Sequence, residues 1–364
     1  MESVLHTAIE VDNERSFSNA GHLLMLSRCD SVHHLLRLGL LRPDDLVDRP
    51  ITVSEQLTRN HLIRVEKDDG SGFIIKEPRN ADELDASTMW MEATVSWLSA
   101  NDPSFGRMKQ WLPQYLHYHE PQKILTCELI SSAEPLVSML LSAPRLDPAV
   151  FREIGKAFGT LHGAVSIGSA HGQQHRLFSP LMPWVLTLGS NTHRYAPRTV
   201  AAAAVLREVM LNGSAVRALA QLREHWRSTQ VIHGDAKTTN ILVLEDSSIR
   251  IVDWEISNLG DGLWDVASIM HSLIVPNPRA HTDPLDVAMA KAAMLIEPVW
   301  EGYLEQGPSL PPGLDARGAA YRMAGARLIQ TCLECGYYPG RLPGSMPLLL
   351  DMAFGLLNPP DTGL

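Results

Sequence analysis

The chain has 364 residues, 45% of them hydrophobic and 20% charged, which is typical of a folded protein with one large domain or two lobes. Its formal net charge of −10 argues against a nucleic-acid partner, although it is compatible with a cationic substrate. The apolar stretches are too short to span a membrane and the acidic start differs from a secretion signal, so we expect a cytoplasmic protein without a membrane partner.

The N-terminal half is predicted to be rich in β-structure. Residues 1–48 form an expected helical extension, in which "SVHHLLRLGLLRPDDLVD" has apolar residues at helical spacing. Three strand patterns follow in "ITVSEQL", "HLIRVE" and "FIIKEP", and the 3.6-residue period of residues 82–100 predicts a helix. Strand patterns in "YLHYH" and "KILTCELI" complete an expected N-lobe over residues 49–130.

Residues 131–364 are predicted to form a larger, mostly helical lobe. It is interrupted by "VIHGDAKTTNILVLEDSSIRIVDWE", in which Asp235 follows an apolar strand on a glycine-containing loop. The two strand patterns after Asp235 predict a β-hairpin that brings Asn240 and Asp253 to one edge. Amide and carboxylate oxygens suit a hard cation such as Mg²⁺, which also keeps waters and phosphate oxygens. Asp235 is then left to orient an attacking hydroxyl.

These motifs resemble the aminoglycoside phosphotransferase and choline kinase-like family, the bacterial relatives of protein kinases. The similar segments are "HGDAKTTN", "IVDWE", "FIIKEP", "MEATVSWL", "LTCELI" and "GDGLWDVA". The resemblance implies an α+β, two-lobed, protein-kinase-like fold that binds ATP and Mg²⁺ between its lobes. It implies that Lys76 binds phosphate and pairs with Glu92, and that Glu128 and Ile130 lie in the segment that holds adenine. Asp265 is expected to brace the catalytic loop.

The sequence departs from the protein-kinase pattern in three places. No glycine lies between the first two strands, so Ser54 and Asn60 become candidates for phosphate contact, with an ordinary polar turn as the alternative. Glu255 stands where protein kinases have the glycine of their DFG motif, and the switch of that motif is therefore not expected. Lys237 occupies the position of a lysine in Ser/Thr protein kinases. It is either a catalytic cation near the transferring phosphoryl group or a solvated surface lysine.

Other residues that can carry chemistry have structural explanations. His162 and His233 are expected to support the catalytic loop, and the alanine-rich stretch from Ala201 is expected to be a helix core. Cys332 and Cys335 are separated by two residues, but no second ligand pair for zinc is near them in the sequence. We expect these cysteines to pack in a half-buried helix face.

The acceptor of the phosphate is expected to be a hydroxyl group. Residues 57–78 and 35–48 are similar to the kinases of class V lanthipeptide and thioamitide maturation, which phosphorylate Ser or Thr of a precursor peptide before a separate lyase acts. That resemblance implies a peptide acceptor and a lyase or cyclase partner. A small-molecule kinase of the aminoglycoside or choline type is the alternative. A non-catalytic, nucleotide-binding pseudokinase is disfavoured because Lys76, Asp235, Asn240 and Asp253 are all present.

Overall fold

The computed structural model describes residues 25–47, 49–57, 60–79, 83–142, 147–164, 174–190, 195–275, 285–310, 314–335 and 346–358. The first part of the predicted N-terminal extension therefore lies outside the described residues. The chain divides into two compact units, one formed by Met1–Ala133 with Arg250–Ile256 and the other by Glu134–Ile249 with Ser257–Leu364. The return of Arg250–Ile256 to the first unit places the "VDWE" segment with the N-terminal sheet.

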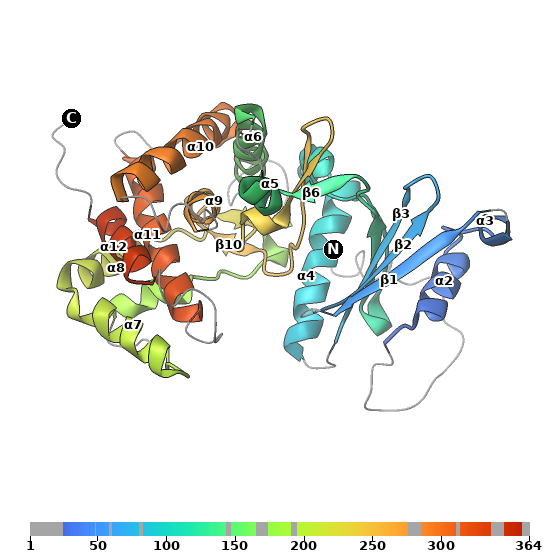
Figure 1. Cartoon of the computed structure of the whole chain (residues 1–364), viewed down its shortest axis with the longest axis horizontal. Helices are drawn as coiled ribbons and strands as arrows, with labels where there is room; N and C mark the ends of the chain where they lie inside the picture. Colours follow the sequence, from blue (N-terminus) through green and yellow to red (C-terminus); the bar gives the residue numbers. More distant parts are fainter. Residues whose placement is uncertain are drawn as a thin grey trace. The chain divides into compact units, whose positions relative to one another are not determined.

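The first unit is built on a five-stranded antiparallel sheet in the order β1-β2-β3-β5-β4 (Figure 1). The predicted strand patterns and the predicted helix are all found in this unit. The strands are β1 (Ile51–Leu57), β2 (Asn60–Lys67), β3 (Gly72–Pro78), β4 (Tyr115–His119) and β5 (Ile124–Glu128). The helices are α2 (Arg28–Arg37), α3 (Pro43–Val47) and α4 (Glu83–Asn101), with the 3₁₀ helices η1 (Phe105–Trp111) and η2 (Glu120–Gln122).

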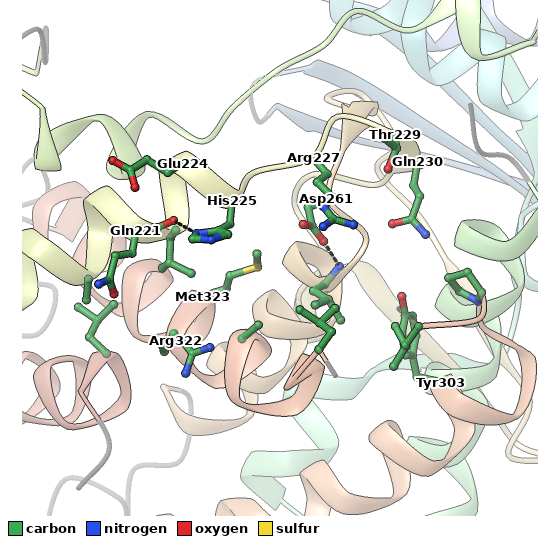
Figure 2. Close-up of a pocket in the computed structure, with 18 of the residues that line it drawn as sticks. Gln221, Glu224, His225, Arg227, Thr229, Gln230, Asp261, Tyr303, Arg322 and Met323 are labelled. Carbon is green, nitrogen blue, oxygen red and sulfur yellow. Dashed lines mark hydrogen bonds between the residues drawn. The ribbon is translucent and has the colours of Figure 1, made fainter. Parts of the chain in front are cut away.

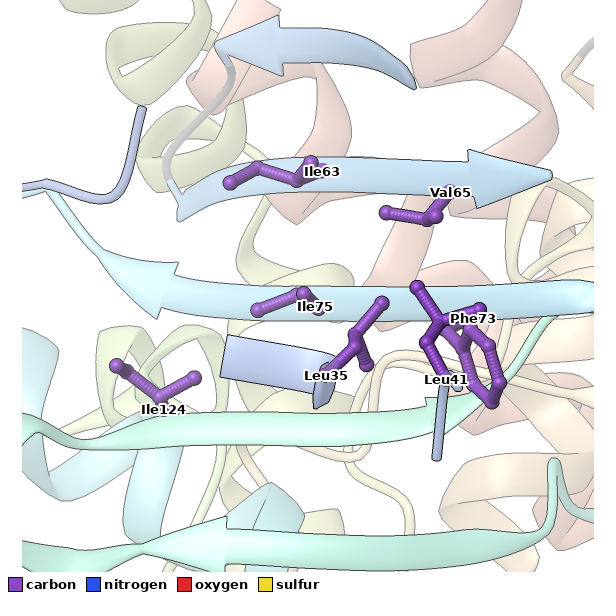
Figure 3. Packing of buried hydrophobic residues seen from close by; sticks show 7 residues of the cluster. All are labelled: Leu35, Leu41, Ile63, Val65, Phe73, Ile75 and Ile124. Carbon is purple, nitrogen blue, oxygen red and sulfur yellow. The ribbon is translucent and has the colours of Figure 1, made fainter. Parts of the chain in front are cut away.

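The two faces of this sheet have different partners, because successive side chains of a strand point in opposite directions. One face packs against α2 and the turn that follows it, through Leu35, Leu41, Ile63, Val65, Phe73, Ile75 and Ile124 (Figure 3). The other face carries Lys76 of β3, and there Met89 and Ala93 of α4 pack with Leu125 of β5. The N-terminal extension thus covers the sheet face opposite to Lys76.

A buried carboxylate ties the start of this extension to the sheet. Oε1 of Glu77 accepts a hydrogen bond from the backbone N–H of Leu26 (2.8 Å) and lies 2.7 Å from Nδ1 of His61. Ser27 then caps α2 through a reciprocal capping box with Asp30. The helix therefore begins at a fixed point over the sheet.

His34 of α2 is a buried histidine next to other potential cations. Its Nε2 lies 3.2 Å from Oγ1 of Thr126 in β5. Burial, together with the neighbouring His117, Arg37 and His119, lowers the pKa of His34 to about 4. His34 is therefore uncharged in the folded protein near neutral pH.

We expect this histidine to make stability sensitive to acid. Between pH 6.5, the ordinary pKa of histidine, and about pH 4, the unfolded chain takes up a proton at His34 that the folded chain does not, so the free energy of unfolding falls as the pH falls through this window. Urea denaturation at several pH values measures this slope. His34→Gln should flatten it, whereas His33→Gln, at the exposed neighbouring position, should not. An equal slope in wild type and His34→Gln would contradict the prediction.

The second unit is mainly helical. Its helices are α5 (Leu136–Ser142), α6 (Pro148–Ala164), α7 (Val200–Leu211), α8 (Gly213–His225), α9 (Leu263–Ile274), α10 (Leu285–Gln306), α11 (Ala316–Cys335) and α12 (Met346–Leu357). The 3₁₀ helices are η3 (Gln174–Leu177), η4 (Trp184–Gly189) and η5 (Thr238–Asn240). The alanine-rich stretch forms α7 and buries Ala202, Val205 and Val209, as predicted for a core helix.

Short strands carry the functional segment. In the second unit, β7 (Gln230–Ile232) pairs in antiparallel fashion with β10 (Asn258–Gly260). The predicted hairpin forms from β8 (Ile241–Leu244) and β9 (Ile249–Ile251), in a three-stranded sheet with β6 (Ala133–Pro135). The end of β9 begins the segment that belongs to the first unit.

Helices α6 and α10 cross at backbone contact because glycine lines the crossing. A Cβ atom on Gly155 would lie 2.0 Å from the carbonyl oxygen of Val299, and one on Gly302 would lie 2.0 Å from that of Arg152. This close approach brings Tyr303 of α10 to His162 of α6, with 3.2 Å between the hydroxyl and Nδ1. The crossing thereby forms the floor beneath the catalytic loop.

Candidate active site

The first unit brings together three residues that the sequence predicted for nucleotide and metal binding. Nζ of Lys76 donates a hydrogen bond to Oε1 of Glu92 in α4 at 2.5 Å, so the predicted ion pair forms. The same ammonium lies 3.9 Å from Oδ1 of Asp253. The side chain of Lys76 is only 15% exposed, and burial by itself favours its neutral form. The Glu92 and Asp253 carboxylates outweigh burial and raise the pKa of Lys76, which keeps the ammonium charged.

Asp253 has an unusual backbone conformation. Its φ angle is 71°, in the left-handed region that non-glycine residues rarely adopt. Next to it, Nε1 of the buried Trp254 donates to the carbonyl oxygen of Ile251 at 3.0 Å, which fixes the turn after β9. A conformation of this kind persists only where the surrounding structure holds it, and such positions cluster at functional sites.

Asn60 makes a contact that the sequence did not indicate. Its Nδ2 donates to Oε2 of Glu255 at 3.0 Å, and both residues belong to the first unit. Asn60 and Lys76 lie on the same face of the sheet, because Leu62 pairs with Lys76 and Asn60 is two residues before Leu62. The glutamate of "DWE" therefore ties the Asp253 segment to β2, and a phosphate contact by Asn60 stays a prediction.

We expect this hydrogen bond to stabilise the first unit. A bond to a charged group contributes about 1.5–3 kcal/mol, so Asn60→Ala and Glu255→Ala should show a coupling of about that size in a double-mutant cycle. Glu255→Gln keeps an acceptor oxygen and should retain much of the coupling. Denaturation of the four variants checks the prediction, and strictly additive losses would contradict it.

The second unit holds the catalytic loop through Asp265 of α9. Its two carboxylate oxygens accept hydrogen bonds from the backbone N–H groups of His233 (2.7 Å) and Gly234 (3.0 Å). Its Oδ2 also lies 3.2 Å from Nε2 of the fully buried His162. Gly234 has a φ angle of 83°, a conformation that glycine adopts without strain and that turns the chain toward Asp235. The predicted bracing role of Asp265 and the supporting roles of both histidines are confirmed.

Asp235 lies between two cations. Lys237 donates to its Oδ2, and Nη2 of Arg327 in α11 donates to its Oδ1 at 3.0 Å. Burial favours the neutral carboxyl, but the two cations lower the pKa of Asp235 below its ordinary value. Lys237 is therefore in contact with the predicted base and is not a freely solvated lysine.

The predicted metal ligands belong to different units, and their pairing remains a prediction. Asn240 ends η5 and is buried, and its Nδ2 donates to the carbonyl oxygen of Asp235 at 3.1 Å. This bond orients the amide and leaves its oxygen as the ligand atom. Among the described residues no cluster of three or more His, Cys, Asp or Glu side chains suits a metal. An oxygen pair from Asn240 and Asp253 fits Mg²⁺, which takes its remaining ligands from water and phosphate.

The remaining predicted contacts lie on the sheet of the first unit. Ser54 of β1 is exposed and pairs with Arg64, so it lies on the same sheet face as Lys76, one row further along. Glu128 ends β5, where its backbone N–H donates to Gln114, and Ile130 lies just beyond that strand. Their contacts with phosphate and adenine remain predictions. In α11, Cys332 is buried, in agreement with a packing role, and the Cys335 side chain lies outside the described set.

A cavity of about 940 Å³ lies in the second unit but contains none of the predicted catalytic residues. Figure 2 shows Gln230 and Asp261, from the paired ends of β7 and β10, together with Arg322 of α11. Gln230 starts β7, whereas Asp235 follows the other end of that strand. Burial raises the pKa of Asp261. The cavity therefore lies away from the site of transfer that Asp235 marks.

The fold and the two groups of polar residues define a kinase-like phosphotransferase. The model of the Phosphotransferase enzyme family (APH) matches residues 55–305, which is more than half of the chain, and the chain belongs to this family. It is an enzyme with an α+β, two-lobed, kinase-like fold. No match to a curated protein was found. In the described part of the chain, no helix has the length and apolar character needed to cross a bilayer.

Solved structures with the same fold share little sequence with this chain. Amicoumacin kinase hAmiN, solved with AMP-PNP, Ca²⁺ and Ami, has a TM-score of 0.55 and 11% identity, over 91% of this chain and 94% of that one. A choline/ethanolamine kinase family protein from Mesorhizobium loti has a TM-score of 0.50 and 16% identity, over 90% and 93%. Macrolide 2′-phosphotransferase MphH from Brachybacterium faecium has a TM-score of 0.50 and 17% identity, over 91% and 99%. These similarities describe the fold and not the acceptor.

Proposed function

We propose that the protein transfers the γ-phosphate of ATP to a Ser or Thr hydroxyl of a ribosomally made precursor peptide, in a pathway of the class V lanthipeptide or thioamitide type. In this proposal Lys76 binds the α- and β-phosphates while Glu92 holds its ammonium in place. Ser54 and Asn60 approach the phosphates, and Glu128 and Ile130 hold adenine through their backbone. Asn240 and Asp253 hold Mg²⁺, which neutralises charge on the β- and γ-phosphates.

The acceptor hydroxyl is oriented by Asp235. In a loose phosphoryl-transfer transition state the hydroxyl keeps its proton until late, so Asp235 chiefly holds the attacking oxygen in line and then accepts the proton. Lys237 reaches the transferring phosphoryl oxygens and stabilises their charge. The product is a phosphorylated acceptor, and for a peptide a separate lyase or cyclase is the partner that removes the phosphate.

The charge around Asp235 is the observation that supports a peptide acceptor over a polyamine. One carboxylate faces two cations, Lys237 and Arg327, so this group of three side chains carries one net positive charge. A polycationic acceptor docked here meets like charge, which disfavours binding. A neutral Ser or Thr hydroxyl meets no such penalty. The overall net charge of −10 is spread over the whole chain and does not change this local balance.

Small-molecule phosphorylation is the competing function. The amicoumacin, choline/ethanolamine and macrolide enzymes of the same fold carry small acceptors in their names. A neutral small alcohol fits the charge at Asp235 as well as a peptide hydroxyl does, whereas a polycationic aminoglycoside does not. The identity of the acceptor therefore has to be decided by experiment.

Mass spectrometry of candidate acceptors tests the proposal. The enzyme is incubated with Mg²⁺ and ATP and with a precursor peptide from the same gene neighbourhood, with the same peptide in which every Ser and Thr is replaced by Ala, and with kanamycin-like amines, choline and macrolides. We expect phosphoryl groups on the unmodified peptide alone. Phosphorylation of a small molecule but not of the peptide would overturn the peptide assignment and leave the kinase assignment intact.

A further inference from the structure

Arg327 is a buried cation whose ion pair is with the predicted catalytic carboxylate. Its side chain is 9% exposed, and Nη2 lies 3.0 Å from Oδ1 of Asp235. The guanidinium carbon lies 5.7 Å from the ring centre of Trp264 in α9, a distance at which a cation is attracted to an aromatic ring. A charge is retained in an interior only when it is paired, and Asp235 supplies the opposite charge.

The surroundings of Arg327 keep its charge directed at Asp235. His271 of α9 lies near it, and burial together with the Arg327 charge lowers the pKa of His271 to about 3, so this histidine adds no second cation. Nε2 of His271 lies 2.8 Å from Oγ1 of Thr331, which ties α9 to α11 close to Arg327. The arginine therefore extends from a helix whose position is fixed by its neighbours.

The two cations at Asp235 differ in how freely they can leave it. Each contacts a different oxygen, Arg327 at Oδ1 and Lys237 at Oδ2. The Lys237 side chain is 37% exposed, against 9% for Arg327. An incoming hydroxyl needs one oxygen of the carboxylate, and the exposed lysine regains water when it turns away. The buried arginine would instead leave its charge unpaired in the interior.

We propose that Arg327 is a positioning residue that anchors Asp235 through Oδ1, so that Oδ2 faces the acceptor hydroxyl when Lys237 turns to the phosphate. This inference rests on the proposed phosphotransferase function. During transfer the acceptor oxygen forms a bond to the γ-phosphorus, the bond from that phosphorus to the leaving oxygen of ADP breaks, and the hydroxyl proton passes to Oδ2 of Asp235. Arg327 touches neither the nucleotide nor the acceptor.

Steady-state kinetics of Arg327→Gln and Arg327→Lys test the proposal. We expect Arg327→Gln to lower kcat by roughly 10²-fold, the loss that follows small misplacement of a catalytic group, with ATP affinity unchanged. Arg327→Lys should recover part of this loss, because it keeps the charge but not the planar fork of donors. Arg322→Gln is the matched control on the same helix, since its half-buried arginine lies 3.8 Å from Asp315. A wild-type kcat in Arg327→Gln, or an equal loss in Arg322→Gln, would overturn the proposal.

Two further readouts separate positioning from a general structural role. In an Asp235→Asn background, Arg327→Gln should cause no further loss of kcat, because it acts through the carboxylate that is already gone; an equal loss in both backgrounds would refute positioning. Thermal unfolding identifies variants that do not fold, in which case Arg327→Lys carries the test. If no acceptor is phosphorylated, the proposed function fails, and a crystal structure of the arginine variant still decides the positioning role. There we expect the Asp235 carboxylate to be displaced, and an unmoved carboxylate would refute the inference.

Discussion

Replacing Asp235 by asparagine is expected to lower the rate of phosphate transfer by roughly 10² to 10⁴, the usual contribution of a positioned general base. Asparagine keeps the shape and one acceptor oxygen but does not take the proton of the hydroxyl. Lys76 and Glu92 lie in the other unit, so we expect ATP affinity to be preserved. Measurements of kcat with the phosphorylated acceptor and of ATP binding by calorimetry check both parts.

Asp246→Asn is the matched control for this variant. Asp246 is exposed in the turn between β8 and β9, and its Oδ1 accepts a hydrogen bond from the backbone N–H of Ser248 at 2.9 Å. Asparagine keeps that oxygen, so the control should retain wild-type activity. Asp235→Asn should also lower the melting temperature, because it removes the counter-charge of Arg327. Full transfer activity in Asp235→Asn would contradict its assignment as the base.

Replacing Lys76 by methionine is the second change with a large expected effect. We expect turnover to fall by roughly 10²- to 10³-fold, comparable to the loss of one preorganised charge-stabilising donor, and ATP binding to weaken. The same change leaves Glu92, whose side chain is 7% exposed, without its cation. Removal of one partner from a buried pair costs about 3–5 kcal/mol of stability, so the single variant combines a folding defect with a catalytic one.

The double variant Lys76→Met with Glu92→Gln separates these two effects. It removes both charges, so stability should recover toward that of wild type while activity stays lost. Lys67→Met on the neighbouring strand β2 is the control, because Nζ of Lys67 lies over the Phe73 ring on the other side of the sheet. Normal turnover in the double variant, measured by ADP formation, would refute the role of Lys76.

The sequence was sufficient to predict the elements of the first unit because its strands alternate and its helix has a clear period. The patterns of β2 and β3 fix which side chains share a face, and the ion pair of Lys76 with Glu92 follows from that alternation and the resemblance. The place of Arg250–Ile256 within the first unit was not predictable. Assignment of a short strand end to one unit depends on tertiary packing, which has no local signal.

The parts of the site that sequence reasoning missed depend on contacts between distant residues. Arg327 is 92 positions from Asp235 along the chain, and Asn60 is 195 positions from Glu255. The signal for Arg327 was a single charge within the apolar stretch of α11, which implies a buried counter-ion without naming it. For Glu255 the signal was a charged residue in place of glycine after Asp253. Neither pattern identifies its partner.

The central claim is that this chain catalyses phosphate transfer from ATP to a hydroxyl. The most direct measurement quantifies ADP and phosphorylated acceptor in one reaction, with Mg²⁺, after its removal by EDTA, and with the Asp253→Asn variant. The account predicts one ADP for each phosphorylated acceptor in the wild-type reaction with Mg²⁺, and neither product in the other two. Binding of ATP with no ADP formed across the whole acceptor panel would contradict it and would indicate a nucleotide-binding pseudokinase.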